Sequence, residues 1–333
     1  MTTYEQSLKT TFKVQLSEKY GNDPVERAFA IIDGLKDAGK DTGTYEDLMT
    51  YVATQDVDGE LIQEIVYQIS EGAGILYTVE RTVDKKPEGL MEMISSIFSP
   101  QKVPVLYGLV GLRNGERDGK DILEVQYGGG QTDCVLDEEG NVKEILEFNP
   151  EVTAAREAFE ELKFQVLPEK FELSKAIYSV NTNSGLPCWV YLIHLTREEE
   201  QELRDNFIAS VPTAWDAWNA VKDQDDEDGR EPTKEEYKLM PEMLDVVIFP
   251  LDRFRETVPA FFDWKKEEKE RKKEAEKKFP EDKDAQKRAA KLTEDEEVEK
   301  IRDLMLVERN GDPVVLRGFQ NFFADIVLKK IMN

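Results

Sequence analysis

The sequence predicts an α+β fold, because the character of its segments changes along the chain. Residues 1–75 carry apolar side chains at helical spacing, whereas from residue 103 short apolar runs alternate with glycine-containing turns, as in strands. Between residues 265 and 300 nearly every residue is charged or Ala, which is typical of a solvated helix or charged linker. We therefore expect a helical N-terminal region, a central domain with a mixed sheet, and a charged C-terminal segment.

The composition excludes several classes of partner and of binding site. The 333 residues are 40% hydrophobic and carry a net charge of −26, which favours a folded, acidic protein. Such a surface repels nucleic acid and anionic membranes, so we expect neither as a general partner. One histidine and two cysteines exclude zinc clusters and disulfide frameworks, and no apolar run approaches the ~20 residues of a membrane span. The expected location is cytoplasmic.

The N-terminal region, 1–85, is expected to be helical. Residues 7–20 are amphipathic, Asn22-Asp23-Pro24 begins a second helix, Thr44 precedes a third, and residues 58–69 form a fourth. The region contains no catalytic motif, so we interpret it as a surface for packing, for homo-oligomers or for a larger assembly. The short apolar segment 89–98 suits a helix that faces the core or another subunit better than one on a membrane surface.

The central domain is expected at 103–262. Its apolar runs predict strands that are joined by turns, with one helix between them and a helical acidic insertion at 197–241. The expected strands are 103–112, 122–127, 134–136, 142–146, 176–180, 188–195 and 246–249, and the expected helix is 151–162.

The C-terminal part divides into two elements. Residues 263–303 are expected as a charged helix or linker, and residues 304–333 as a hairpin around Asn310-Gly311 followed by an amphipathic helix. Phe319, Phe322 and Phe323 lie on one side of that helix and offer a subunit contact.

The segment from Arg156 to Phe164 holds the candidate chemistry. On a helix, Glu157, Glu160 and Glu161 share one face. Carboxylates that crowd together repel one another, and a bound Mg²⁺ or Mn²⁺ relieves that repulsion. Such an ion polarises a diphosphate and activates water. Arg156 is placed to hold one glutamate in a fixed rotamer.

These residues resemble the signature of the Nudix hydrolase superfamily, an Arg-Glu-apolar-x-Glu-Glu-x-Gly-apolar box. Arg156, Glu157, Ala158, Glu160, Glu161 and Phe164 match it. The strand that ends in Gly128-Gly129-Gly130 resembles the Gly-Gly before the family's box, and Pro250-Leu251-Asp252 resembles the end of its closing strand. The resemblance covers residues 103–262.

The resemblance implies a Nudix-like α/β/α sandwich with a mixed sheet. It also implies Mg²⁺-dependent hydrolysis of a pyrophosphate bond in a nucleoside diphosphate linked to another moiety. Glu157, Glu160 and Glu161 would hold the metal and act in catalysis with Arg156, while Gly129 and Gly130 would contact the nucleotide-type small molecule. The alternative is a catalytically inactive Nudix-like protein that serves binding or assembly.

The sequence departs from the box in three ways. Lys163 stands where the family has glycine, and Phe148 stands where it has an upstream glutamate, with Glu147 and Glu151 out of register. The chain also has about a dozen extra residues before Arg156, which the hairpin at 134–146 would absorb.

Other candidates remain open. The resemblance also implies a further carboxylate from the loop before the closing strand, for which Glu242 and Asp245 are the candidates, although either suits a solvent-facing position. Arg113 and Arg117 are expected in a turn that either meets an anionic substrate or is merely solvated. Finally, the insertion contains aromatic residues that favour helix packing over a nucleobase platform or lid: Trp215, Trp218 and Tyr237.

Overall fold

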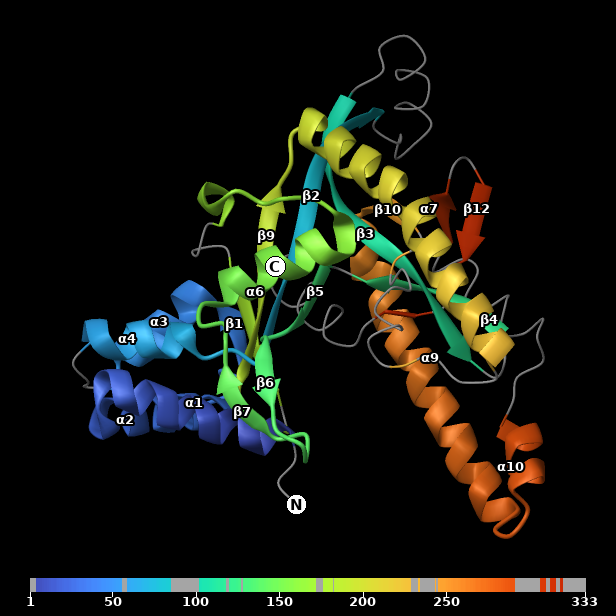
Figure 1. The fold of residues 1–333 in the computed structure, drawn as a ribbon. Coiled ribbons are helices and arrows are strands. Elements are labelled where there is room, and N and C mark those ends of the chain that lie inside the picture. Colours follow the sequence, from blue (N-terminus) through green and yellow to red (C-terminus); the bar gives the residue numbers. More distant parts are fainter. Residues whose placement is uncertain are drawn as a thin grey trace, which may run out of the picture. The chain divides into compact units, whose positions relative to one another are not determined.

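The computed structural model describes residues 4–55, 59–84, 102–117, 120–126, 128–171, 176–181, 183–228, 233, 243, 245–290, 306–309, 312–315 and 318–319. The chain contains helices and a mixed sheet, so the predicted mixture of α and β structure is confirmed (Figure 1). It forms two compact units: one comprises Met1–Val79, Leu109–Gly111 and Gln126–Val246, the other Glu80–Gly108, Leu112–Val125 and Val247–Asn333. None of the described helices has the length and apolar character to cross a membrane.

The four predicted N-terminal helices are present in the first unit. They are α1 (Tyr4–Tyr20), α2 (Asn22–Asp37), α3 (Tyr45–Ala53) and α4 (Gly59–Gln68). Thr44 begins α3 through a capping box, because its hydroxyl accepts from the Asp47 N–H while the Asp47 side chain accepts from the Thr44 N–H. Leu8, Phe12, Phe29 and Ile32 are fully buried between these helices.

The first unit also contains a mixed sheet. Its strands are β1 (Thr42–Thr44), β2 (Gly72–Asp84), β5 (Gly128–Gln131), β8 (Ile177–Val180) and β9 (Pro187–His194). Of β2, the residues up to Val79 belong to this unit. The order is β1-β8-β9-β2, with β9 parallel to β2 and the other pairs antiparallel, and β5 pairs antiparallel with the first residues of β2. The strand β2 lies within 1–85, for which the sequence analysis expects only helices.

The predicted hairpin is formed by β6 (Cys134–Leu136) and β7 (Val142–Ile145). Polar side chains of α1, spaced four residues apart, hydrogen-bond the free edge of β7. Ser7 Oγ accepts from the Val142 N–H, Thr11 Oγ1 donates to the Val142 carbonyl, and Gln15 bonds both backbone groups of Ile145. The helix thereby satisfies an edge strand that would otherwise expose its backbone.

Two further helices belong to the first unit. The second unit consists mostly of strands and charged helices. α6 (Pro150–Leu162) and α7 (Arg197–Asp228) match the expected helix and the start of the acidic insertion, and η1 (Pro168–Lys170) is a short 3-10 turn. In the second unit β4 lies between β3 and β13, and β10 pairs with β3. The elements are β3 (Lys102–Arg117), β4 (Lys120–Gln126), β10 (Asp245–Pro250), α9 (Leu251–Lys278), α10 (Lys283–Ala290), β11 (Leu306–Arg309), β12 (Asp312–Val315) and β13 (Gly318–Phe319).

The C-terminal expectations are confirmed in part. The charged segment contains the helices α9 and α10, and β11 pairs antiparallel with β12 around Asn310-Gly311. Phe319, the first residue of the expected helix 319–331, belongs instead to strand β13, where it pairs with Val125 of β4. The rest of that expected helix and the apolar segment 89–98 lie outside the described residues.

Candidate functional site

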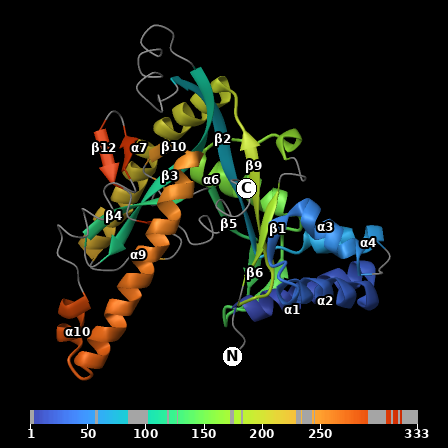
Figure 2. The same cartoon turned by 180° about the vertical axis from the view of Figure 1, so that it is seen from behind.

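Helix α6 carries the acidic segment and lies across one face of β2, β5 and β9 (Figure 1). Figure 2 shows the opposite face of these strands. The helix begins at Pro150, which suits a first helical position, and it buries Thr153, Ala154, Ala158 and Leu162. Glu161 is buried on the helix as well, whereas Glu160 is exposed.

Both ends of α6 have unusual backbone conformations. Asn149 precedes the helix with φ 80°, and Lys163 follows it in the left-handed region with φ 54° and ψ 29°. These two are the non-glycine residues with positive φ in the described part of the chain. A lysine pays about 1 kcal/mol for this conformation, which glycine adopts freely. Lys163 therefore takes the helix-ending geometry without the residue that suits it best.

The glycines of β5 allow α6 to approach the sheet closely. A Cβ atom on Gly130 would lie 2.2 Å from Glu157 Oε1, so a larger residue at this position would require that carboxylate to move. One residue earlier, the Gly129 N–H donates to Glu161 Oε2 at 2.9 Å. Gly129 and Gly130 thus contact the candidate carboxylates themselves.

Arg156 binds the surrounding carboxylates and the end of β5. Its Nε donates to Glu147 Oε1 at 2.7 Å, and its Nη2 donates to Glu147 Oε2 at 3.2 Å and to the Gln131 carbonyl at 2.9 Å. The remaining nitrogen, Nη1, donates to Glu157 Oε1 at 2.7 Å and to Glu160 Oε2 at 3.0 Å. One guanidinium therefore anchors itself on Glu147 and bridges two of the three candidate glutamates.

Glu147 is a structural carboxylate in this arrangement. It also accepts from the Asp133 N–H at 3.0 Å and from Thr153 Oγ1 at 2.8 Å. Burial raises the pKa of Glu147, but the hydrogen bonds from Arg156, Asp133 and Thr153 outweigh burial and hold that pKa below its usual value. Burial alone would lower the pKa of Arg156, yet its hydrogen bonds to Glu147 and the nearby negative charges raise it. Both groups are therefore charged at neutral pH.

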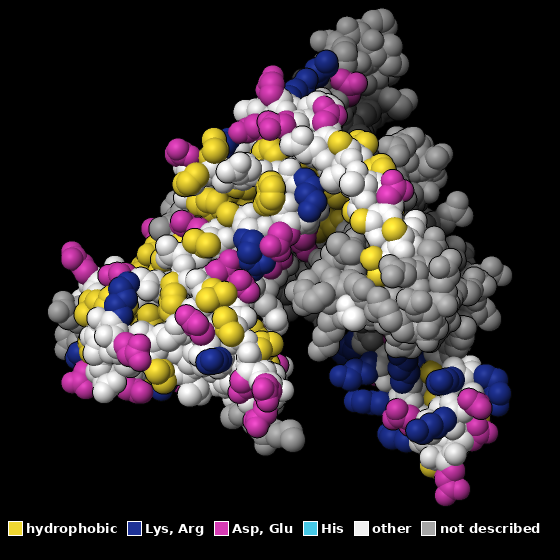
Figure 3. Space-filling view, viewed as in Figure 1, with side chains coloured by type: hydrophobic (Ala, Val, Ile, Leu, Met, Phe, Trp, Pro, Cys, Tyr) yellow, Lys and Arg dark blue, Asp and Glu magenta, His cyan; other side chains and the backbone are white. Residues whose placement is uncertain are grey.

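The three candidate glutamates differ in their access to solvent. The Glu160 side chain is 57% exposed, the Glu157 side chain 14%, and Glu161 as a residue 8%. Over α6, acidic and basic side chains lie together among exposed apolar ones (Figure 3). Within the described residues no three His, Cys, Asp or Glu side chains are arranged as a ready metal-binding group.

The donor set nevertheless suits a hard divalent cation. Carboxylate oxygens are the ligands that Mg²⁺ and Mn²⁺ prefer, and the glycine at position 130 keeps one carboxylate against the sheet. Arg156 Nη1 already places one positive charge between Glu157 and Glu160. The other two guanidinium nitrogens have their own partners, so Arg156 stays anchored if Nη1 gives up these bonds.

The upstream departures from the box have a structural explanation. Phe148 packs edge-to-face on Phe12 of α1, with ring centroids 5.7 Å apart, so this position belongs to the core between α1 and the hairpin. The adjacent Glu147 supplies the carboxylate for Arg156 in its place. Glu151 instead accepts from the Tyr67 hydroxyl at 2.7 Å.

The remaining candidates lie elsewhere. Asp245 starts β10 and its side chain accepts from the Val246 N–H, while Glu242 and Tyr237 lie outside the described residues. Arg113 and Arg117 belong to strand β3 rather than to the expected turn. Trp218 is buried in α7, in keeping with a packing role.

The strand beneath α6, β2, is not among the strands expected from the sequence. The run Ile75-Leu76-Tyr77-Thr78-Val79, which is rich in β-branched and aromatic residues and follows Gly72 and Gly74, is a strand signal that could have located β2. Tyr77 is 0% exposed; burial raises the pKa of its hydroxyl, and the negative charge of Glu161 raises it further.

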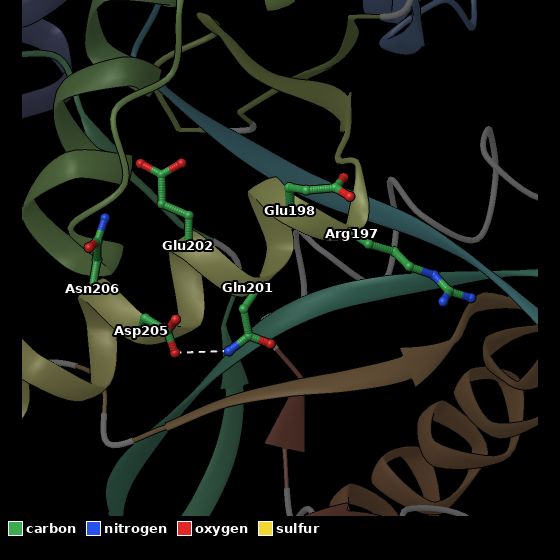
Figure 4. A pocket seen from close by; sticks show the side chains of 6 residues that line it. All are labelled: Arg197, Glu198, Gln201, Glu202, Asp205 and Asn206. Atoms are coloured by element: carbon green, nitrogen blue, oxygen red, sulfur yellow. Dashed lines mark hydrogen bonds between the residues drawn. The ribbon is translucent and has the colours of Figure 1, made fainter.

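A second acidic helix start, at α7, lacks these features. Residues of this helix between Arg197 and Asn206 line a shallow depression on its surface. There Gln201 Nε2 donates to Asp205 Oδ1 (Figure 4). Arg197 and Glu198 are exposed, and Glu199 caps the helix by accepting from the Thr196 N–H.

Comparison with known proteins leaves the family open. No family model matches the chain, and no curated protein matches it.

Proposed function

We propose that the protein hydrolyses a pyrophosphate bond in a nucleoside diphosphate linked to another moiety, with Mg²⁺ or Mn²⁺ held by Glu157, Glu160 and Glu161. The proposal includes a Nudix-like arrangement of α6 on the sheet. The observation that carries it is the left-handed conformation of Lys163, which stands where the resembling family has glycine. The helix keeps that ending although the residue disfavours it.

The three candidate glutamates have different roles in this proposal. Glu157 and Glu161 are held against β5, by the space above Gly130 and by the Gly129 N–H respectively. Glu160 faces solvent, so a substrate would reach this carboxylate directly. A divalent cation bound by these carboxylates would polarise the diphosphate and lower the pKa of a water molecule.

Arg156 acts as a positioning residue in this proposal. Its two bonds to Glu147 and one to the Gln131 carbonyl fix the guanidinium on β5, independently of the candidate glutamates. Nη1 then orients Glu157 and Glu160, and its charge reduces their mutual repulsion.

A second function is favoured by a different observation. Because Arg156 Nη1 already bridges Glu157 and Glu160, the carboxylates are neutralised in part by the protein itself. A catalytically inactive Nudix-like protein for binding or assembly needs no more than this. The N-terminal helices and the charged α9 and α10 would then supply the contacts.

The two functions are separated by a hydrolysis assay. Wild-type protein is tested with Mg²⁺ on ADP-ribose, dinucleotides, diadenosine polyphosphates and nucleoside triphosphates, beside a Glu160→Gln, Glu161→Gln variant. A Glu198→Gln, Glu202→Gln variant removes the same charge from α7 and is the matched control.

The hydrolase predicts turnover that needs the metal, is lost by at least about 10²-fold in the α6 variant, and is unchanged in the α7 variant. Absence of turnover on every substrate, together with absence of metal binding, would reject the hydrolase and leave the binding or assembly function.

A further inference from the structure

The hydroxyl of Tyr77 is buried without a hydrogen-bond partner. Tyr77 is 0% exposed, and among the described residues its Oη is one of three buried side-chain atoms that lack a partner. Other buried tyrosines are satisfied: Tyr178 donates to the Lys40 carbonyl at 2.6 Å, and Tyr191 shares a hydrogen bond with Tyr67. An unpaired buried hydroxyl destabilises a fold by about 1–3 kcal/mol relative to a paired one. Phenylalanine would fill the same space without that penalty.

The sheet register places Tyr77 on the face that α6 covers. Gly130 presents its missing Cβ toward Glu157 of α6, and Gly130 pairs with Ala73 of β2. Side chains of paired residues point to the same face, and along a strand every second residue returns to that face. Ala73, Ile75 and Tyr77 therefore all face α6.

The ring of Tyr77 reaches the end of α6, where the candidate carboxylates lie. It packs edge-to-face on Phe164, with ring centroids 5.9 Å apart, and Phe164 follows Glu161 by three residues. Burial raises the pKa of the Tyr77 hydroxyl, and the negative charge of Glu161 raises it further. The phenol thus stays protonated, as a donor, in the buried layer beneath Glu161.

We infer that Tyr77 is the positioning residue for Glu161, and that its hydroxyl donates a hydrogen bond to this carboxylate when a divalent cation is bound. This role rests on the proposed function, because it concerns the same carboxylates. In the metal-free protein the Gly129 N–H holds Glu161 Oε2. With the cation bound, the buried hydroxyl gains the partner that it otherwise lacks, and the carboxylate is fixed from below. Such outer partners of metal ligands commonly change metal affinity by 10–100-fold.

The test compares two Tyr→Phe variants by Mn²⁺ titration calorimetry and by thermal unfolding without metal. Tyr77→Phe should weaken Mn²⁺ binding by about 10-fold or more. Its metal-free melting temperature should equal or exceed that of the wild type, because no hydrogen bond is lost. Tyr178→Phe is the control: it should lower the melting temperature, because it loses the bond to Lys40, and leave the Mn²⁺ affinity unchanged.

A double-mutant cycle shows whether Tyr77 acts through Glu161. In a Glu161→Gln background, Tyr77→Phe should have little further effect on Mn²⁺ affinity, whereas independent effects would multiply. Multiplying effects, or unchanged Mn²⁺ affinity in Tyr77→Phe, overturn the role of Tyr77 while the wild-type metal site stands. If the wild type itself binds no Mn²⁺, the proposed function fails and the role of Tyr77 fails with it.

Discussion

Two helices of this protein carry an Arg-Glu pair followed by further glutamates, in the second half of α6 and at the start of α7, but the surroundings of the two pairs differ. In α6, Arg156 lies between Glu147, Glu157 and Glu160, and the strand below carries glycines that admit Glu157. In α7, Arg197 and Glu198 face solvent, while Glu199 caps the helix and pairs with Lys170 at 2.6 Å.

The comparison shows that glutamate spacing alone does not define a site. Glu200 of α7 is buried, yet its carboxylate holds Arg204, whose Nη1 donates to the Val246 carbonyl and ties the helix to β10. The acidic residues of α7 are thus used for capping and packing. In α6, Glu157 and Glu160 share one guanidinium and Glu161 accepts from the Gly129 N–H of the glycine strand below, and these contacts distinguish the candidate site.

Among the substitutions considered, one in the strands beneath α6 should have the largest effect on stability. Gly72 of β2 pairs with Gln131, and a Cβ on Gly72 would lie 2.4 Å from the Gly130 carbonyl oxygen. Because backbone cannot move aside as a side chain can, Gly72→Ala should lower the free energy of unfolding by about 3 kcal/mol in urea denaturation. Gly59→Ala, where the nearest atom is 3.8 Å away, is the control and should leave stability nearly unchanged. Equal effects would show that β5 does not lie this close to β2.

Elements that depend on interactions between residues close in the sequence could be predicted, whereas those that depend on distant residues could not. The helices α1 to α4 and α6 and the β6–β7 hairpin follow from local periodicity, capping residues and the turn at Gly140, all of which lie within a few residues. The position of β2 beneath α6 depends on pairing between Gly72 and Gln131, far apart in the chain. Local pattern alone does not contain that pairing.

The candidate site was predictable in its residues but not in its contacts. The helical spacing of Glu157, Glu160 and Glu161 is a local property, and α6 confirms that they lie on one helix. Glu147 reaches Arg156 despite its shifted register, and Asn149 between them has a positive φ; sequence spacing reveals neither. The place of Tyr77 beneath α6 likewise depends on the sheet and could not be predicted from the sequence.

The next largest effect on stability should be seen when Arg156 of α6 is replaced, and it should exceed the effect of replacing Arg197 of α7. Arg156→Met removes the partner of Glu147, whose side chain is only 9% exposed, and should lower the free energy of unfolding by about 2 kcal/mol. Arg197→Met, at the corresponding place in the exposed start of α7, should change it by less than about 0.5 kcal/mol. Urea denaturation at neutral pH measures both, and similar losses would remove the distinction between the helices.

The stabilisation by Arg156 should depend on pH. Because the folded protein lowers the pKa of Glu147, this carboxylate contributes stability above its unfolded pKa, and the contribution disappears as the pH falls through the folded value. The difference in unfolding free energy between wild type and Arg156→Met should therefore be largest above about pH 5 and shrink toward about pH 3. A difference that grows on acidification would contradict the Glu147–Arg156 pairing.

The smallest effect concerns the end of α6. Lys163→Gly should raise the free energy of unfolding by about 0.5–1 kcal/mol, since glycine adopts φ 54° without strain. The hydrogen bond from Lys163 Nζ to the Glu160 carbonyl, at 2.6 Å and exposed, offsets little of this gain. Thermal unfolding tests the sign: a loss of stability would mean that the lysine side chain matters more than its backbone conformation.

The central claim, that the α6 carboxylates bind a divalent cation, is tested most directly by electron paramagnetic resonance of added Mn²⁺. Three proteins are compared: the wild type, a Glu157→Gln, Glu160→Gln, Glu161→Gln variant of α6, and the Glu198→Gln, Glu202→Gln variant of α7. We predict a saturable Mn²⁺ site in the wild type that is lost in the α6 variant and kept in the α7 variant. Mn²⁺ binding that survives in the α6 variant, or that is absent from the wild type, would contradict the account.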